Sequence, residues 1–148
     1  MATALGSQPA APAGWWWLFA AWLTAAGATA GSLFFSSVMD LPPCVLCWYQ
    51  RIALFPLVLV LAAGLFPFDA RVVRYALPLA AAGWAVAGYH NLLYWGVVPE
   101  SLSPCSEGVS CTNKHLDLFG VVSIPLLSWV GFTVLIALVV VLKRRASS

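Results

Sequence analysis

Four long stretches without a charged side chain constrain this sequence more than any other feature. Apart from His90 in the third, they hold no Asp, Glu, His, Lys or Arg, and they are Trp15–Met39, Ile52–Phe68, Tyr75–Pro99 and Leu118–Leu142. About 20 helical residues cross a hydrocarbon layer roughly 30 Å thick. Backbone groups in lipid must be paired within their own segment, which favours helices. The sequence therefore predicts an all-α fold, a four-helix membrane bundle. The expected spans are about 15–38, 46–67, 75–97 and 119–142.

The composition agrees with a membrane protein. Hydrophobic residues make up 62% of the 148 residues and charged residues 8%, whereas soluble domains carry about 25% charged residues. The net charge of +2 is too small to indicate a nucleic-acid partner. We expect a single membrane domain over residues 1–148, with the lipid bilayer around it and no nucleic acid.

Prolines and small residues recur inside the expected spans. In a membrane bundle a proline usually kinks a helix rather than ending it, so we expect kinks at Pro56, Pro78 and Pro125. Small residues are dense in the first and third spans and predict close packing between helices. They include Gly27, Gly31, Gly83 and Gly88.

Positive residues predict the orientation of the bundle. Arg71 and Arg74 lie between the second and third spans, and 143–145 close the chain with Lys-Arg-Arg. Because positive residues favour the cytoplasmic side, we expect both termini to be cytoplasmic and the loops 39–47 and 99–118 to be outside. Residues 1–14 hold no Lys or Arg, so we expect a disordered tail there rather than a cleaved signal peptide.

All four cysteines fall in the two loops expected outside. They form a Cys-x-x-Cys pair, Cys44 and Cys47, and a wider pair, Cys105 and Cys111. Three interpretations are open: two structural disulfides, a zinc site, or redox chemistry. A Cys-x-x-Cys ring is too small to gain much from loop closure, which disfavours a structural disulfide there. The wide second spacing is unusual for zinc.

The position of Cys47 favours redox chemistry. Because Pro42 and Pro43 come before the first pair, we expect Cys47 at or near the start of the second helix, where the helix dipole stabilises a thiolate. Arg51 is one turn further on, on the same helix face. Its alternative role is an interfacial anchor.

An ionisable side chain and several aromatic ones gather at the same depth in the expected membrane. His90 lies in the outer half of the third span, where an ionisable residue is either functional or forms a hydrogen bond between helices. Together with Trp48, Tyr49, Tyr89 and Tyr94 it is expected to line a pocket for a flat ring that bears carbonyl groups.

Two motifs carry a resemblance to a known family. The run Cys44-Val-Leu-Cys-Trp-Tyr-Gln-Arg51 resembles the signature of the DsbB family of disulfide-forming membrane proteins. The later stretch Pro104–Cys111, followed by Phe119-Gly120 and by Ser123–Leu127, is similar to its BdbC branch, whose second cysteine loop is short. The resemblance covers the chain from the first span through the fourth.

The resemblance implies a quinone-dependent thiol:disulfide oxidoreductase in the bacterial cytoplasmic membrane. A DsbA- or BdbD-like thioredoxin-fold protein would attack Cys105, Cys111 would exchange with Cys44, and Cys47 would reduce ubiquinone or menaquinone, with no metal. Arg51, and with it His90, Trp48 and Tyr49, would bind the quinone.

Two alternatives differ in class. One is a relative of vitamin K epoxide reductase, in which the loop cysteines come before the Cys-x-x-Cys pair, whereas here they follow it. The other is a membrane subunit without catalytic activity, stapled by disulfides or holding zinc.

Overall fold

The protein folds into four long helices joined at alternating ends. The computed structural model describes residues 12–105, 109–111, 117–118 and 122–146. The long helices are α1 (Ala13–Ser37), α2 (Val45–Leu65), α3 (Val73–Tyr94) and α4 (Ile124–Ala146). The short elements are the 3-10 turns η1 (Ala70–Val72) and η2 (Glu100–Leu102) and the antiparallel strands β1 (Asp117–Leu118) and β2 (Val122–Ser123). The all-α prediction is confirmed apart from these two-residue strands.

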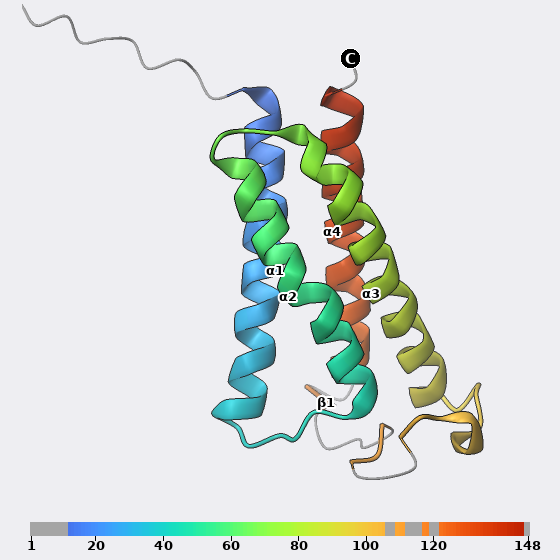
Figure 1. Ribbon diagram of the computed structural model, residues 1–148. Coiled ribbons are helices and arrows are strands. Elements are labelled where there is room, and N and C mark those ends of the chain that lie inside the picture. Colours follow the sequence, from blue (N-terminus) through green and yellow to red (C-terminus); the bar gives the residue numbers. More distant parts are fainter. Residues whose placement is uncertain (1–11, 106–108, 112–116, 119–121, 147–148) are drawn as a thin grey trace, which may run out of the picture.

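The helices run side by side and each packs against two neighbours, in the cyclic order α1, α2, α3, α4. The start of α1, the connection from α2 to α3 and the end of α4 lie at one end of the bundle (Figure 1). The connections from α1 to α2 and from α3 to α4 lie at the other end, called the cysteine end below because it holds all four cysteines. Two loops far apart in the sequence are thereby brought together.

The centre of the bundle is apolar. Leu57, Leu61 and Val139 are fully buried there, with alanines of α1 and α3 between them. The ring of Phe132 on α4 lies directly against Gly83 of α3 and occupies the space that a side chain at position 83 would need. This contact confirms the predicted close packing at Gly83, but Gly27 and Gly31 of α1 have open space in front of them.

Three of the four long helices, α1, α2 and α4, are long and apolar enough to cross a membrane. Although α3 has 22 residues, it carries several polar or amphipathic side chains that lower its hydropathy. They are Arg74, Tyr75, Trp84, Tyr89, His90, Asn91 and Tyr94. Two of these, His90 and Asn91, are buried against the other helices, so the polarity of α3 is turned partly inward.

The fourth helix begins later than predicted. Residues 122–123 pair with 117–118 as strands, and α4 starts only at Ile124. Pro125 therefore lies in the first turn of α4. A backbone N–H in the first turn has no acceptor within the helix, so a proline there breaks no hydrogen bond, and the prediction of a kink at Pro125 is wrong. Pro56 and Pro78 do lie inside α2 and α3. The tail expected over residues 1–14 falls largely outside the described residues, and Ala13 already belongs to α1.

Candidate functional site

The first cysteine pair is held by the start of α2. Pro42 and Pro43 precede the helix, and Cys44 is its N-cap, with extended backbone angles. The Cys44 sulfur accepts a hydrogen bond from the backbone N–H of Cys47, over 3.4 Å. The two sulfurs of the pair are free thiols 3.0 Å apart. This geometry leaves the pair ready to close a disulfide with little movement.

The cap position corrects one prediction. Cys47 was expected to be the sulfur that the helix start stabilises, but Cys47 lies in the first turn and Cys44 receives its N–H. The hydrogen bond from the Cys47 thiol, aided by His90, lowers the pKa of the Cys44 thiol to about 4 although burial opposes that shift. The negative charge of the reduced pair therefore rests on Cys44.

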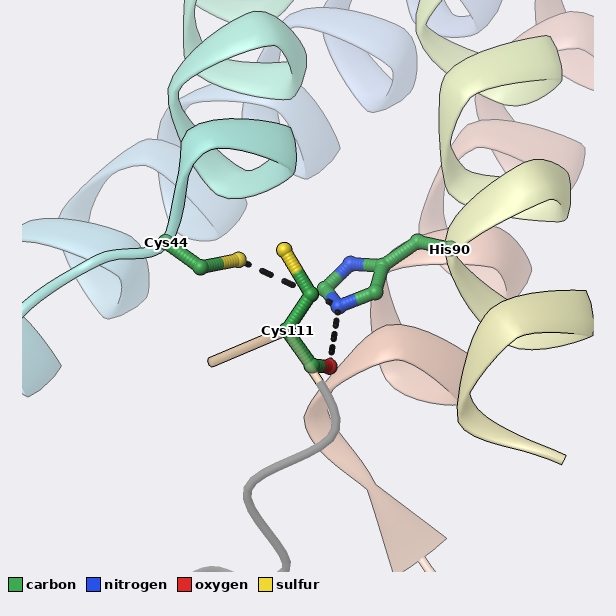
Figure 2. Close-up of side chains that lie close together, drawn as sticks. All are labelled: Cys44, His90 and Cys111. Atoms are coloured by element: carbon green, nitrogen blue, oxygen red, sulfur yellow. Dashed lines mark hydrogen bonds between the residues drawn. The ribbon is translucent and has the colours of Figure 1, made fainter. Parts of the chain in front are cut away.

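The second cysteine pair meets the first at the cysteine end. Cys105 and Cys111 form a disulfide, with their Cα atoms 5.9 Å apart, and both are buried. The sulfurs of Cys44 and Cys111 and a ring nitrogen of His90 all lie within 4.8 Å of one another (Figure 2). Thiol–disulfide exchange requires one sulfur to reach another. The fold has thus brought Cys111 of one loop next to Cys44 of the other.

His90 lies between the two pairs. Its Nε2 is 3.1 Å from the carbonyl oxygen of Cys111 and 3.9 Å from the sulfur of Cys44 (Figure 2). Its Nδ1 is 3.2 Å from the side-chain nitrogen of Gln50. The ring is 3% exposed. His90 therefore contacts the cysteines directly, which its sequence position alone did not predict.

An apolar cavity of about 390 Å³ opens beside the first pair, between α1, α2 and α4. Cys47 lies on its wall, and so do polar groups of Ser32, Gln50, Arg51 and Ser128. The rest of the wall is apolar or glycine: Gly27, Ala28, Gly31, Phe35, Leu41, Pro42, Pro43, Leu54, Ile124, Leu127, Gly131, Phe132 and Leu135. Sites for small apolar ligands have this volume and this mixture of apolar walls with a few polar groups.

Arg51 is the one cation on the described wall of this cavity. It is only 8% exposed, and α1 holds its guanidinium. Nε donates to the hydroxyl of Ser32 and Nη2 to the carbonyl of the same residue, each over 2.8 Å. The guanidinium also lies 5.3 Å from the centre of the Trp48 ring. A buried and doubly bonded arginine is a fixed charge rather than an anchor reaching for headgroups.

The other predicted pocket residues lie elsewhere. Trp48 and Tyr49 are about half exposed, at 52% and 49%, because successive residues of α2 point in different directions. Tyr89 donates its hydroxyl hydrogen to the carbonyl of Leu102, in the loop after α3. Neither these three side chains nor His90 is among the described residues that line the cavity. The single pocket expected from the sequence is therefore two places, one around His90 and one around Arg51.

Sequence reasoning missed three polar residues of the site. Ser32 anchors Arg51, and Ser128 of α4 donates its hydroxyl hydrogen to the side-chain oxygen of Gln50. Gln50 is 7% exposed and joins α4 to His90 on α3. The available signal was polarity: each is an uncharged polar residue inside an otherwise apolar stretch, where an unpaired polar group is costly.

The soft ligands at the cysteine end also bear on the zinc interpretation. Cys44, His90 and Cys111 have ligand atoms close enough to share one ion. Cys111, however, is joined to Cys105, and zinc binds a thiolate rather than a disulfide sulfur. With the Cys105–Cys111 disulfide formed, the cluster places the sulfurs of Cys44 and Cys111 close enough for thiol–disulfide exchange.

Comparisons with known proteins agree on one family. The family model described as "Disulfide bond formation protein DsbB" matches residues 14–142. A "Probable disulfide formation protein" of Metapseudomonas resinovorans is 42% identical, covering 92% of this chain and 96% of its own. A "Probable disulfide formation protein C 2" of Bacillus cereus is 47% identical, over 84% and 89% of the two chains. The "Disulfide bond formation protein C" of Bacillus subtilis is 38% identical, over 88% and 94%. No solved structure matches.

Proposed function

This chain belongs to the DsbB family of disulfide bond formation proteins, and we propose that it transfers electrons from a thioredoxin-fold dithiol protein to a membrane quinone. Membership in this family implies an oxidoreductase that supports disulfide formation. The quinone and the DsbA- or BdbD-like partner are the finer part of the proposal. The observation that carries it is the cavity in which Cys47 and the buried Arg51 share an apolar wall.

The cavity fits a quinone head in its chemistry. A quinone is a flat apolar ring with two carbonyl oxygens, so it needs apolar walls and a small number of hydrogen-bond donors. Arg51, Gln50 and Ser128 supply polar groups, and α1 and α4 supply the apolar wall. Arg51 would hold a quinone oxygen, because its guanidinium stabilises negative charge in a water-poor site. The glycines of α1 and α4 leave the space in which the ring would lie.

Electrons enter at the loop pair and move to the pair at the start of α2. A partner thiolate attacks Cys105, the Cys105–Cys111 bond breaks, and the second partner thiol releases the mixed disulfide, so that two electrons rest on Cys105 and Cys111. Exchange with an oxidised Cys44–Cys47 pair moves these two electrons to Cys44 and Cys47. The reduced pair would give a quinone in the cavity two electrons and the Cys47 proton, and a second proton from water would complete the quinol.

The state described here fits the moment before quinone reduction. Cys105 and Cys111 are joined, while Cys44 and Cys47 are reduced and 3.0 Å apart. Cys47 is the sulfur of the pair that lies on the cavity wall, and Cys44 faces the other pair. Forming the Cys44–Cys47 bond therefore returns the first pair to its oxidised state without moving either loop.

The proposal includes the sidedness of the bundle. We place all four long helices across the bacterial cytoplasmic membrane, with α3 sheltered by α2 and α4, both termini cytoplasmic and the cysteine end outside. Reporter fusions after Arg74 and Arg145 are expected to be cytoplasmic, and one at Gly108 extracytoplasmic. A cytoplasmic reporter at Gly108 contradicts this orientation.

Filling the cavity tests the quinone site directly. Gly131 of α4 lines it, and an added Cβ would meet nothing within 4 Å. Gly131→Leu is expected to raise the quinone concentration for half-maximal reduction about tenfold or more, because overfilling a packed site costs about 1–3 kcal/mol. Thiol exchange with the partner is expected to stay unchanged. Gly131→Ala is the matched control, with a small effect, and equal quinone kinetics in both variants would place the quinone elsewhere.

A further inference from the structure

A chain of three buried or half-buried polar side chains runs from α4 to the cysteines, and its hydrogen bonds have one direction. The hydroxyl of Ser128 donates to the side-chain oxygen of Gln50. The side-chain nitrogen of Gln50 lies 3.2 Å from Nδ1 of His90. With the Gln50 amide oriented so that its oxygen accepts from Ser128, its nitrogen donates to Nδ1, which then carries no proton. The carbonyl of Cys111, 3.1 Å from Nε2, can only accept, so Nε2 carries the proton.

In this arrangement of neighbours, His90 is the tautomer with its hydrogen on Nε2. That hydrogen points into the space shared by the Cys111 carbonyl and the Cys44 sulfur, which is 3.9 Å from Nε2 (Figure 2). A neutral imidazole held in this way acts as a hydrogen-bond donor to sulfur and not as a base toward it. Cys44 also receives the backbone N–H of Cys47, so two N–H groups meet at this one sulfur.

We propose that His90 is a catalytic residue of the exchange between the two cysteine pairs, which stabilises Cys44 as the departing thiolate. Gln50 and Ser128 are positioning residues that keep the proton on Nε2. The proposal rests on the electron route proposed above, but it concerns a step that involves no quinone.

The step proceeds in two halves. First, the Cys111 thiolate attacks the Cys44 sulfur, a Cys44–Cys111 bond forms, the Cys44–Cys47 bond breaks, and Cys47 leaves as a thiolate that takes up a proton. Next, the Cys105 thiolate attacks Cys111, the Cys105–Cys111 bond forms, and Cys44 leaves with the electron pair. A thiol leaves faster when its thiolate is more stable, so the His90 donor drives the second half toward the arrangement described here.

The carbonyl of Cys111 gives His90 a second task in the same step. By donating to that carbonyl, Nε2 holds the backbone of Cys111 beside α3 and keeps its sulfur within reach of Cys44. Tyr89, one residue earlier on α3, also holds this loop, because its hydroxyl donates to the carbonyl of Leu102. That hydrogen bond does not involve a cysteine. Comparing variants of His90 and Tyr89 therefore distinguishes an effect on the position of the loop from an effect on the Cys44 sulfur.

The test uses the full-length Cys47→Ser protein in detergent, without quinone or partner. Its three cysteines allow three pairings, of which Cys44–Cys105 is quantified separately. The two isomers of the proposed step are Cys44–Cys111 with free Cys105, and Cys105–Cys111 with free Cys44. Acid quenching, alkylation of the free thiol and peptide mass spectrometry give their ratio at equilibrium. The substituted side chain at position 47 keeps a hydroxyl donor beside Cys44, so the effect of His90 is measured alone.

His90→Phe is expected to shift the ratio about tenfold toward the Cys44–Cys111 isomer, the size of a lost hydrogen bond to a charged group. Gln50→Leu and Ser128→Ala are expected to shift it a few-fold in the same direction, and Tyr89→Phe, the matched control, to leave it unchanged. Nitrogen NMR of the His90 ring is expected to show the Nε2–H tautomer, and a tautomer mixture in Gln50→Leu, a change that a purely structural role would not produce.

Two results would overturn the proposal. One is an isomer ratio that stays unchanged in all three variants, His90→Phe, Gln50→Leu and Ser128→Ala. If His90→Phe does not fold, an unchanged ratio in Gln50→Leu and Ser128→Ala has the same meaning. The other is a proton on Nδ1 in the unmutated ring. Because no quinone enters the experiment, a failed quinone assay leaves this result standing, and an unchanged ratio leaves the quinone proposal standing.

Discussion

The two cysteine pairs differ in how the fold holds them. Cys44 is the N-cap of α2 and Cys47 lies in its first turn, with the two sulfurs 3.0 Å apart and the backbone N–H of Cys47 donated to Cys44. Cys105 and Cys111 lie six positions apart, between α3 and α4, in a segment whose described part holds little regular structure. The first pair is placed by a helix, and the second is placed by the contacts that its loop makes with α3.

The difference matches two tasks in an electron relay. A pair on a helix end keeps one sulfur on the cavity wall and the other toward the incoming electrons, so its geometry stays constant. A pair in a loop can present one sulfur to a large partner and the other to Cys44.

Replacing one loop cysteine is expected to give an all-or-none result. In Cys111→Ser, the free Cys105 thiolate should attack the disulfide of the oxidised partner and form a mixed disulfide, with the second partner sulfur leaving as a thiolate. This mixed disulfide should accumulate, because the chain lacks the internal sulfur that would displace the partner from Cys105. Non-reducing electrophoresis after incubation with the oxidised partner measures it. Cys105→Ser is the matched control and is expected to trap little. Trapping through Cys111 alone would reverse the roles assigned to the loop pair.

Removing the fixed charge on the cavity wall is expected to slow one half of the relay. Arg51→Ala should lower the rate of quinone reduction about 100-fold, the usual loss when one preorganised donor to a developing anion is removed. Single-turnover exchange with the partner should change little, since Arg51 contacts Ser32 and not the loop pair. Arg51→Lys should restore only part of the rate, because a lysine lacks the planar set of donors. Equal losses in both half-reactions would argue that Arg51 is structural.

Loosening Arg51 rather than removing it is expected to have the smallest effect. Ser32→Ala deletes the hydroxyl that accepts from Nε but leaves the Ser32 carbonyl that accepts from Nη2. We expect a loss of about 3- to 10-fold in quinone reduction, the size of one hydrogen bond made by a charged group. Thr24→Val on the same helix is the control, because its hydroxyl donates to the Ala20 carbonyl one turn earlier and Thr24 is not among the described residues that line the cavity. A similar loss in both variants would point to a general effect on α1.

Much of the fold was predictable because lipid leaves few choices. Runs without charge were expected to be helices, and each of the four contains one long helix. The start of α4 was not predictable from the absence of charge, because the uncharged run continues through residues 122–123, which are used in a strand pair. The pairing of residues 122–123 with 117–118 outweighed the hydrophobic pattern there, and Pro125 consequently lies in the first turn of α4.

The parts of the site that depend on residue spacing along the chain were predictable. The spacing of Cys44, Cys47 and Arg51 along one helix start follows from the sequence, and so does the approach of the two loops once helix number is known. What sequence could not give is the direction of each side chain around α2. Turning Cys47 to the cavity turns Cys44 to His90 and leaves Trp48 outside, and it is packing against α1 and α3 that sets this rotation.

Quinol formation by the first pair alone is the decisive measurement for the proposed role of Cys44 and Cys47. Protein with Cys44 and Cys47 reduced and Cys105–Cys111 joined is mixed anaerobically with a water-soluble quinone, without partner. We expect one quinol per protein, a new Cys44–Cys47 disulfide, and an unchanged loop disulfide. If no quinol forms while Cys44 and Cys47 stay free, or if electrons leave only when the loop disulfide opens, the central claim that this pair reduces the quinone is contradicted.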